Sequence, residues 1–163
     1  MQDREPMTTS GEQGRRAPLR RFWFDQPEIH LALFGFLFAF VWEMWQMPFY
    51  DMGDVPFQKV TVACTLATFG DTLLMVSAYS VVSLLARCRR WLLKPATWII
   101  AVYLLTGLTV TVLFEELATG AQWGWTYSDR MPFVPGTRIA IVPLLMWVLV
   151  PPLALALARR QPL

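Results

Sequence analysis

Carboxyl side chains are the residues of this chain best suited to chemistry, because they stand within apolar stretches of sequence. They are Glu43, Asp71 and the adjacent pair Glu115 and Glu116. A charged side chain at the centre of a membrane-spanning helix costs about 2.5–3.5 kcal/mol on insertion scales, so such residues usually face a bundle interior or a water-filled cavity. Carboxyl groups in different environments can divide the roles of general acid and general base. These four acids are therefore candidate catalytic residues.

The elements that must position these acids are four long apolar stretches. The chain is 55% hydrophobic with a mean hydropathy of +0.41. Each stretch has about 20 residues or more, which at 1.5 Å per residue can cross a hydrocarbon core of about 30 Å. The sequence predicts an all-α, polytopic membrane protein, with a disordered tail over 1–28 and a transmembrane domain over 29–160. The four expected transmembrane helices are 29–48, 60–86, 97–118 and 138–158.

The distribution of Lys and Arg predicts the orientation. Most basic residues precede the first helix, join the second to the third or follow the fourth, whereas Lys59, Arg130 and Arg138 fall on the other side. The positive-inside rule then places both termini in the cytoplasm, and we expect a multi-pass protein of the bacterial inner membrane. The basic residues are explained by topology and form no patch with interleaved aromatics, so no nucleic-acid partner is expected.

Counting along the helices places the acids in the outer half of the bundle. Glu43 lies about 21 Å along its span, and Asp71 about 16 Å along its own, near the midplane. Glu115 lies about 27 Å from the cytoplasmic start of its helix. We expect these acids to meet in a cavity that opens outward. Arg138 would begin the fourth helix at the level of Glu115 and serve as counter-ion, because a buried charge requires a partner.

Polar and aromatic residues near these acids are candidates for substrate binding. Gln46 shares a helix face with Glu43, and Thr68 belongs to a stripe of threonines beside Asp71. The segment 122–127 reads Gln-Trp-Gly-Trp-Thr-Tyr and could form a lid over the acids, since its glycine allows a tight path. Pro143 should kink the fourth helix near the cavity. The expected substrate-binding residues are Gln46, Thr68, Trp123, Trp125, Tyr127 and Trp147.

Structural roles remain open for several of these residues. Glu43 could reach outward to the interface, and Asp71 could hydrogen-bond a threonine. Adjacent helix positions are about 100° apart, so Glu115 and Glu116 cannot both point inward equally. Trp123 and its neighbours could belong to the belt of aromatic residues at the headgroup level.

Sequence motifs narrow the class of chemistry. The chain has no Walker loop, dinucleotide-binding glycine pattern, H-E-x-x-H, C-x-x-C or G-x-S-x-G. Nucleotide-driven, zinc-protease and serine-hydrolase functions lose support, and we expect neither a metal nor a cofactor.

The stretch from Glu115 to Trp147 resembles that of small bacterial inner-membrane proteins with four helices. Their last helix carries a similar "MP…PG…P-L-L-x-W…PP" pattern, and Glu43 within Trp42–Pro48 fits them as well. The resemblance covers most of the chain beyond the tail. It implies the same fold and location but no particular activity.

A weaker similarity leads to integral-membrane carotenoid hydratases and heterodimeric-type lycopene cyclases. Glu115 or Glu116, Thr119-Gly120, Gly124–Tyr127 and Pro143 match in order an acid, a Thr-Gly, an aromatic loop and a proline-headed helix. The cyclases have paired acids after that proline, where this chain has Leu144-Leu145. The similarity implies a carotenoid-like substrate.

These observations favour an intramembrane lyase or isomerase that acts on a lipophilic, isoprenoid-like molecule by acid–base chemistry. One carboxylic acid, with Asp71 the best candidate, would protonate a double bond, and a second carboxylate would stabilise the resulting cation. The alternatives are an accessory subunit of a larger membrane complex and a proton-coupled or cation-coupled carrier. The expected partners are membrane lipid or a lipophilic small molecule, with a homo-oligomer or membrane-complex partner as a further expectation.

Overall fold

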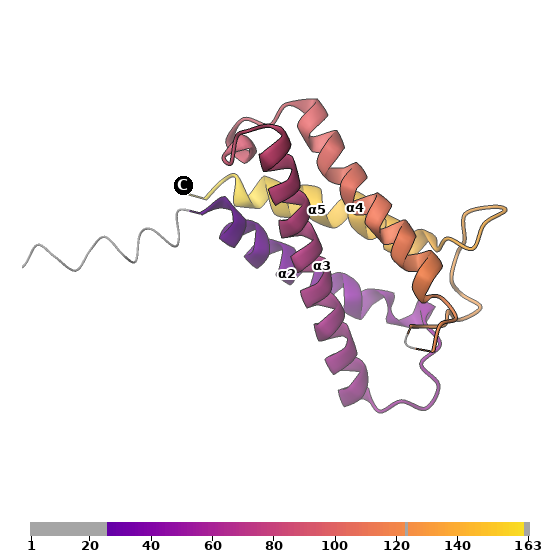
Figure 1. Ribbon diagram of the computed structural model, residues 1–163. Helices are drawn as coiled ribbons and strands as arrows, with labels where there is room; N and C mark the ends of the chain where they lie inside the picture. The colour runs from indigo at the N-terminus through magenta and orange to yellow at the C-terminus, as the bar shows by residue number, and fades with distance from the viewer. Residues whose placement is uncertain (1–25, 123, 162–163) are drawn as a thin grey trace, which may run out of the picture.

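A computed structural model of the chain describes residues 26–122 and 124–161. Within these residues, four helices are long and apolar enough to cross a membrane, with mean hydropathies from 1.4 to 2.3 over their most apolar segments (Figure 1). The prediction of an all-α protein with four such helices is confirmed. The helices are α2 (Pro27–Gln46), α3 (Phe57–Leu85), α4 (Thr97–Ala118) and α5 (Ile141–Ala158), with short 3₁₀ helices η1 (Met47–Phe49) and η2 (Trp91–Leu93).

Prolines help to set where the helices begin. Pro27 opens the first turn of α2, and Pro56 is the N-cap residue of α3. Proline suits these positions because its fixed φ matches the helix and its missing N–H would have no intrahelical acceptor there. The last two residues of the predicted tail are therefore helical, and its residues 1–25 lie outside the described part of the chain.

The start of the fourth long helix corrects two expectations. Helix α5 begins at Ile141 and not at 138, so Arg138 lies in the preceding connection. Pro143 is consequently in the first turn, where backbone N–H groups have no intrahelical acceptor. It breaks no helical hydrogen bond, and the expected kink at this proline was wrong.

The connections lie at two opposite ends of the bundle (Figure 1). The terminal end carries Gln26, Gln161 and the connection 86–96, whereas the loop end carries the connections 47–56 and 119–140. Both ends of the described chain thus lie at the terminal end. That this end faces the cytoplasm stays a prediction.

Aromatic side chains fill the interior from the terminal end to the middle of the bundle. Tyr79 stacks on Trp91 with ring centroids 4.7 Å apart, and Trp91 lies 5.9 Å from Tyr103. Tyr103 in turn lies 6.4 Å from Trp147. We call these four residues the aromatic core. Gly107 allows Trp147 to pack this closely, because a Cβ atom at Gly107 would lie 1.9 Å from the indole ring.

The loop end is more open between α3 and α4. These two helices are joined by the connection 86–96 and diverge toward the loop end (Figure 1). The connections 47–56 and 119–140 are tied to each other there. The Asp51 N–H donates to the Thr126 carbonyl at 3.0 Å, and the Ser128 N–H donates to the Phe49 carbonyl at 3.0 Å.

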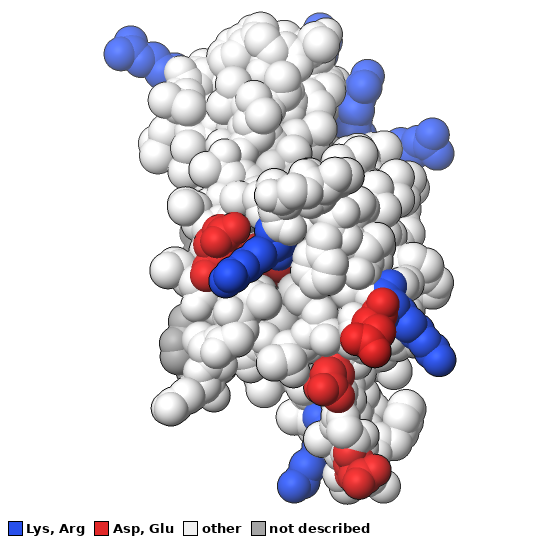
Figure 2. Space-filling view, turned by 90° about the vertical axis from the view of Figure 1, so that its right-hand side faces the viewer, with Lys and Arg blue, Asp and Glu red and all other residues white. Residues whose placement is uncertain are grey.

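The outer surface of the helices is largely apolar. On α2, exposed Leu33, Leu37, Val41 and Trp45 recur every four residues and form a single face. The charged side chains visible on the loop-end side lie in a few groups on an otherwise uncharged surface (Figure 2). This distribution suits helices that are surrounded by lipid.

Candidate functional site

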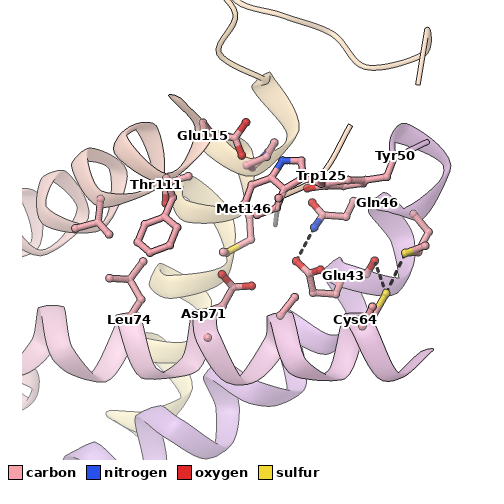
Figure 3. A pocket seen from close by; sticks show the side chains of 18 of the residues that line it. Glu43, Gln46, Tyr50, Cys64, Asp71, Leu74, Thr111, Glu115, Trp125 and Met146 are labelled. Atoms are coloured by element: carbon pink, nitrogen blue, oxygen red, sulfur yellow. Dashed lines mark hydrogen bonds between the residues drawn. The ribbon is translucent and has the colours of Figure 1, made fainter. Parts of the chain in front are cut away.

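A pocket of about 890 Å³ occupies the loop-end half of the bundle (Figure 3). Its walls come from all four long helices and from both loop-end connections. Four carboxyl residues line it, namely Glu43, Asp71 and Glu115 from the long helices and Asp51 from the connection 47–56. The space exists because α3 contributes small residues to the wall, including Ala63, Ala67 and Gly70.

Glu43 is held by neighbours on its own helix. It is 9% exposed, and the Gln46 side-chain amide donates a hydrogen bond of 2.5 Å to its Oε1 atom. The Gln46 carbonyl oxygen accepts a bond of 3.0 Å from the Trp42 indole N–H. These residues are three and four positions apart and therefore share one side of α2. The same side carries buried Ala39, which lets this face pack closely against the rest of the bundle.

Asp71 reaches Glu43 from the opposite wall. The two carboxyl groups, which we call the acid pair, lie within hydrogen-bonding reach of each other (Figure 3). Asp71 follows buried Cys64 and Thr68 by seven and three residues, so the helical repeat turns it toward the interior. Elsewhere in the described chain Asp71 has no hydrogen-bond donor. Two carboxylates this close would repel each other, and one shared proton removes that repulsion.

Glu115 has different partners from the acid pair. The Tyr127 hydroxyl donates to its Oε2 atom, and the Trp125 indole N–H donates to the Tyr127 oxygen at 2.8 Å. The backbone N–H of Ala140, the N-cap residue of α5, also hydrogen-bonds to the Glu115 carboxyl. A negative charge is stabilised near a helix N-terminus by the exposed N–H groups and the helix dipole. Glu115 thus connects the end of α4 with the loop and with the start of α5.

The Trp125 indole separates Glu115 from the acid pair. In Figure 3 it lies between Glu115 on one side and the acid pair on the other. The loop can follow this path because the Gly124 backbone packs directly on the end of α4, where a Cβ atom would lie 1.8 Å from the Ala118 carbonyl oxygen. Gly120 supports the turn with a φ of +77°, a conformation that favours glycine.

The two tyrosines at the loop end are neutral hydroxyl groups at physiological pH. Burial, followed by the hydrogen bond to Glu115 and its charge, raises the pKa of Tyr127. Burial, followed by Tyr127 and then by the carboxyls of Glu43, Glu115 and Asp71, raises the pKa of Tyr50. The Tyr127 hydroxyl therefore remains available to donate its hydrogen bond to Glu115.

Several predicted site residues lie away from the pocket wall. Glu116 is exposed, so Glu115 is the one of these two adjacent acids that points inward. Arg138 is also exposed, in the connection before α5. Among the described residues Arg138 forms no ion pair, so hydroxyl and backbone donors take the place of the expected counter-ion. Trp147 packs in the aromatic core, and Trp123 lies outside the described residues.

The threonine stripe on α3 is satisfied by its own helix. The hydroxyls of Thr61, Thr65, Thr68 and Thr72 each donate to the backbone carbonyl four residues earlier, at 2.7–3.0 Å. Thr68 is fully buried but does not line the pocket. None of these hydroxyls is the partner of Asp71.

Other pocket residues were not among the predicted ones. Tyr50 and Met146 line the wall, and Gly70 leaves open space where a side chain would begin. Tyr50 could have been suspected as an aromatic residue directly after η1, the 3₁₀ helix that follows α2. Gly70 carried no such signal, because an isolated glycine in a span has many uses.

The pocket combines the acid pair with apolar walls and an aromatic roof. Within the described chain, no group of three or more His, Cys, Asp or Glu residues is arranged to hold a metal ion. What the residues present can do is hold and move a proton next to a bound apolar molecule. Comparisons of the chain with protein-family models, curated proteins and solved structures find no match.

Proposed function

We propose that this protein is an intramembrane enzyme that transfers protons to and from a lipophilic, isoprenoid-like molecule. The observation that carries this proposal is the acid pair, two carboxyls from different helices that meet on the wall of an apolar pocket. A carboxyl with a structural role needs a hydrogen-bond donor or a cation as partner. Two carboxyls that share one proton have no such partner, so the pair neither makes the fold more rigid nor balances its own charge. Keeping such a pair is better explained by proton transfer.

The reaction is a protonation of a carbon–carbon double bond. Asp71 in its acid form gives its proton to one alkene carbon, the π electrons form the new C–H bond, and the other carbon becomes cationic. Glu43 as carboxylate then accepts a proton from a neighbouring carbon, which restores a double bond in a new position. If water attacks the cation instead, Glu43 takes the proton of that water and the product is an alcohol.

The surroundings of the acid pair support such a step. Gln46 fixes the Glu43 carboxyl through its amide, so the second acid is oriented before the substrate arrives. The face of the Trp125 indole can stabilise a developing cation. Contact between the two acids allows the proton to return from Glu43 to Asp71, so the pair is reset without an outside group.

Deuterium uptake tests this proposal directly. The purified full chain is reconstituted in lipid nanodiscs with a linear polyisoprenoid hydrocarbon in D₂O, and the extracted hydrocarbon is analysed by mass spectrometry. Asp71→Asn and Glu43→Gln should each lower C–D incorporation about 100-fold or more, the usual size of a general acid–base contribution. In cells, the same variants should change the profile of extracted membrane lipids and pigments.

Glu116→Gln is the matched control, because it removes an exposed carboxyl that does not line the pocket. It should keep the deuterium uptake of the unchanged protein. Equal uptake in the unchanged protein, Asp71→Asn and Glu43→Gln, together with unaltered lipid profiles, would overturn the proposal.

The carrier alternative has less support from the same geometry. A proton or cation that crosses the membrane needs polar groups along its whole path. From the middle of the bundle to the terminal end, the interior is filled by the aromatic core and by apolar residues such as Leu31, Val82 and Leu155. Proteoliposome flux that requires Asp71 would favour the carrier over the enzyme.

A further inference from the structure

The pocket has one sign of charge. Its wall includes the carboxyls of Glu43, Asp51, Asp71 and Glu115, and among the described residues that line it none is Lys, Arg or His. Tyr127 and the Ala140 amide satisfy Glu115, and Gln46 satisfies one oxygen of Glu43. Asp71 receives no hydrogen bond from the described chain apart from its contact with Glu43, although its carboxyl faces the pocket (Figure 3). The pocket therefore lacks a positive group beside Asp71.

The uncharged part of the wall suits a positive group with apolar substituents. Trp125, Tyr50 and Phe114 present aromatic rings, and Met146 presents a polarisable thioether. Aromatic faces attract organic cations, most strongly when the site excludes water. A methylated ammonium group is attracted by such faces and by carboxylates together, whereas a small metal ion requires several fixed oxygen ligands.

The opening of the pocket faces sideways. Leu73 on α3 and Phe114 on α4 both line the pocket, yet they are 68% and 55% exposed. They stand on the two helices that diverge toward the loop end (Figure 1). Because both residues line the pocket and are exposed, we place the entrance between them. The surface of these two helices is apolar as well, with exposed Phe69 on α3 and Leu113 on α4. A ligand that passes between Leu73 and Phe114 comes from the hydrocarbon layer.

We propose that the pocket binds lipophilic monocations, such as long-chain quaternary ammonium ions, which enter from the lipid between α3 and α4 and place the cationic group beside Asp71. The inference rests on the proposed function, since a stable ammonium ion imitates the carbocation formed when a double bond is protonated. A site that stabilises a cationic intermediate binds a stable mimic of it tightly.

Photolabelling in nanodiscs tests the ligand class. The probe is a dodecyltrimethylammonium ion with a diazirine in its chain, and the labelled residues of the full chain are mapped by mass spectrometry. We expect labels on Leu74, Phe114 and Met146, which line the pocket. Unlabelled dodecyltrimethylammonium should compete about tenfold or more better than dodecanol or dodecanoate of equal chain length. This competition uses the unchanged protein, so it does not depend on the folding of a variant.

Two matched pairs of variants locate the site and its entrance. Labelling should fall about tenfold in Asp71→Asn but not in Glu116→Gln, because Glu116 lies outside the pocket. Gly70→Phe should obstruct the pocket, since a Cβ atom at Gly70 meets no neighbour and the ring can extend into the open space. Leu66→Phe adds the same ring to an exposed position of α3 that does not line the pocket, and should leave labelling unchanged.

The outcomes separate this inference from the proposed function. Equal competition by the ammonium ion, the alcohol and the carboxylate would overturn the inference, as would labels spread over the lipid-facing residues of all helices. If deuterium uptake persists while the ammonium ion neither labels the pocket nor inhibits, the enzyme stands and the ligand class is wrong. If the ammonium ion binds beside Asp71 but no deuterium enters any hydrocarbon, the cation site stands and the proposed reaction is wrong.

Discussion

The aromatic core and the pocket lie on the same helices, but large side chains fill the core whereas small side chains of α3 line the pocket. Along α3, the part near the terminal end buries Tyr79 and Val82, whereas the part near the loop end offers Ala63, Ala67 and Gly70. The first part is filled and the second encloses space. Side-chain volume thus decides where the cavity lies. The acids line a cavity that exists because the side chains of α3 are small there. Substitutions that change the packing of the aromatic core should cost stability, whereas substitutions in the pocket should cost function.

The largest stability effect should come from Gly107 on α4, with Gly70 on α3 as its comparison. Gly107→Ala places a Cβ atom 1.9 Å from the Trp147 ring and should destabilise the protein by about 3 kcal/mol, the upper range for overpacking. Gly70→Ala meets open space and should leave the protein equally stable or about 0.5–1 kcal/mol more stable, since alanine favours a helix. Unfolding by SDS in mixed micelles, followed by circular dichroism, measures both. Similar losses in the two variants would contradict the contrast between core and pocket.

Tyr127→Phe tests the loop side of the pocket. The variant leaves the buried Glu115 carboxyl and the Trp125 indole N–H without their shared partner, and should cost about 2 kcal/mol, as for a hydrogen bond to a charged group. The measurement is again SDS unfolding in mixed micelles. Tyrosine-to-phenylalanine variants elsewhere in the chain provide the comparison. Glu115→Leu in the same background should then cost less than Glu115→Leu alone, because the two residues act together. Additive losses would show that the hydrogen bond between Tyr127 and Glu115 does not stabilise the protein.

A smaller effect is expected for the hydroxyls of the aromatic core. Tyr79→Phe loses a hydrogen bond of 2.5 Å to the Arg89 carbonyl and should cost about 1 kcal/mol. Tyr103→Phe should be neutral or stabilising, because the Tyr103 hydroxyl is buried without a partner in the described chain. The same unfolding titration compares the two variants. A loss for Tyr103→Phe as large as for Tyr79→Phe would mean that the Tyr103 hydroxyl has a water or another partner.

The smallest effect should come from the surface of the terminal end. The Arg89 guanidinium and Glu28 form an exposed ion pair at 2.7 Å, and such pairs are weakened by side-chain entropy and salt. Arg89→Ala keeps the backbone carbonyl that binds Tyr79, so it removes the ion pair alone. Its unfolding midpoint should match that of the unchanged protein, and at high salt any residual difference should vanish. A clear loss that resists salt would assign the pair a larger role.

The fold could be predicted because apolar length is a local property of the sequence. The four spans were evident from composition. Their starts moved where a proline set the first turn or where a loop was longer than expected, and α2 and α3 end one or two residues earlier than predicted. Helix α5 is the example, since nothing in the sequence near Arg138 indicates that the chain first pairs Phe133 with Ala140 before the helix begins.

Part of the site could be predicted as well. Counting residues gave the depths of Glu43, Asp71 and Glu115, and all three line one pocket. Depth does not give the rotation of a helix or the path of a loop, so the partners could not be derived. The packing of Gly124 on Ala118 directs the loop that brings Trp125 and Tyr127 to Glu115, and that contact joins residues which a sequence pattern does not relate. The reaction itself remains a prediction.

The hydroxyl-to-carbonyl bonds along the loop-end half of α3 have a mechanical consequence. A threonine that bonds the carbonyl four residues earlier competes with the backbone N–H for that oxygen, and such bonds soften and often bend a helix. Four of them follow one another between Thr61 and Thr72, in the stretch of α3 from which Ala63, Ala67 and Gly70 line the pocket. Of the two helices that form the entrance, α3 is therefore the more compliant. The width of the gap depends on how readily α3 bends.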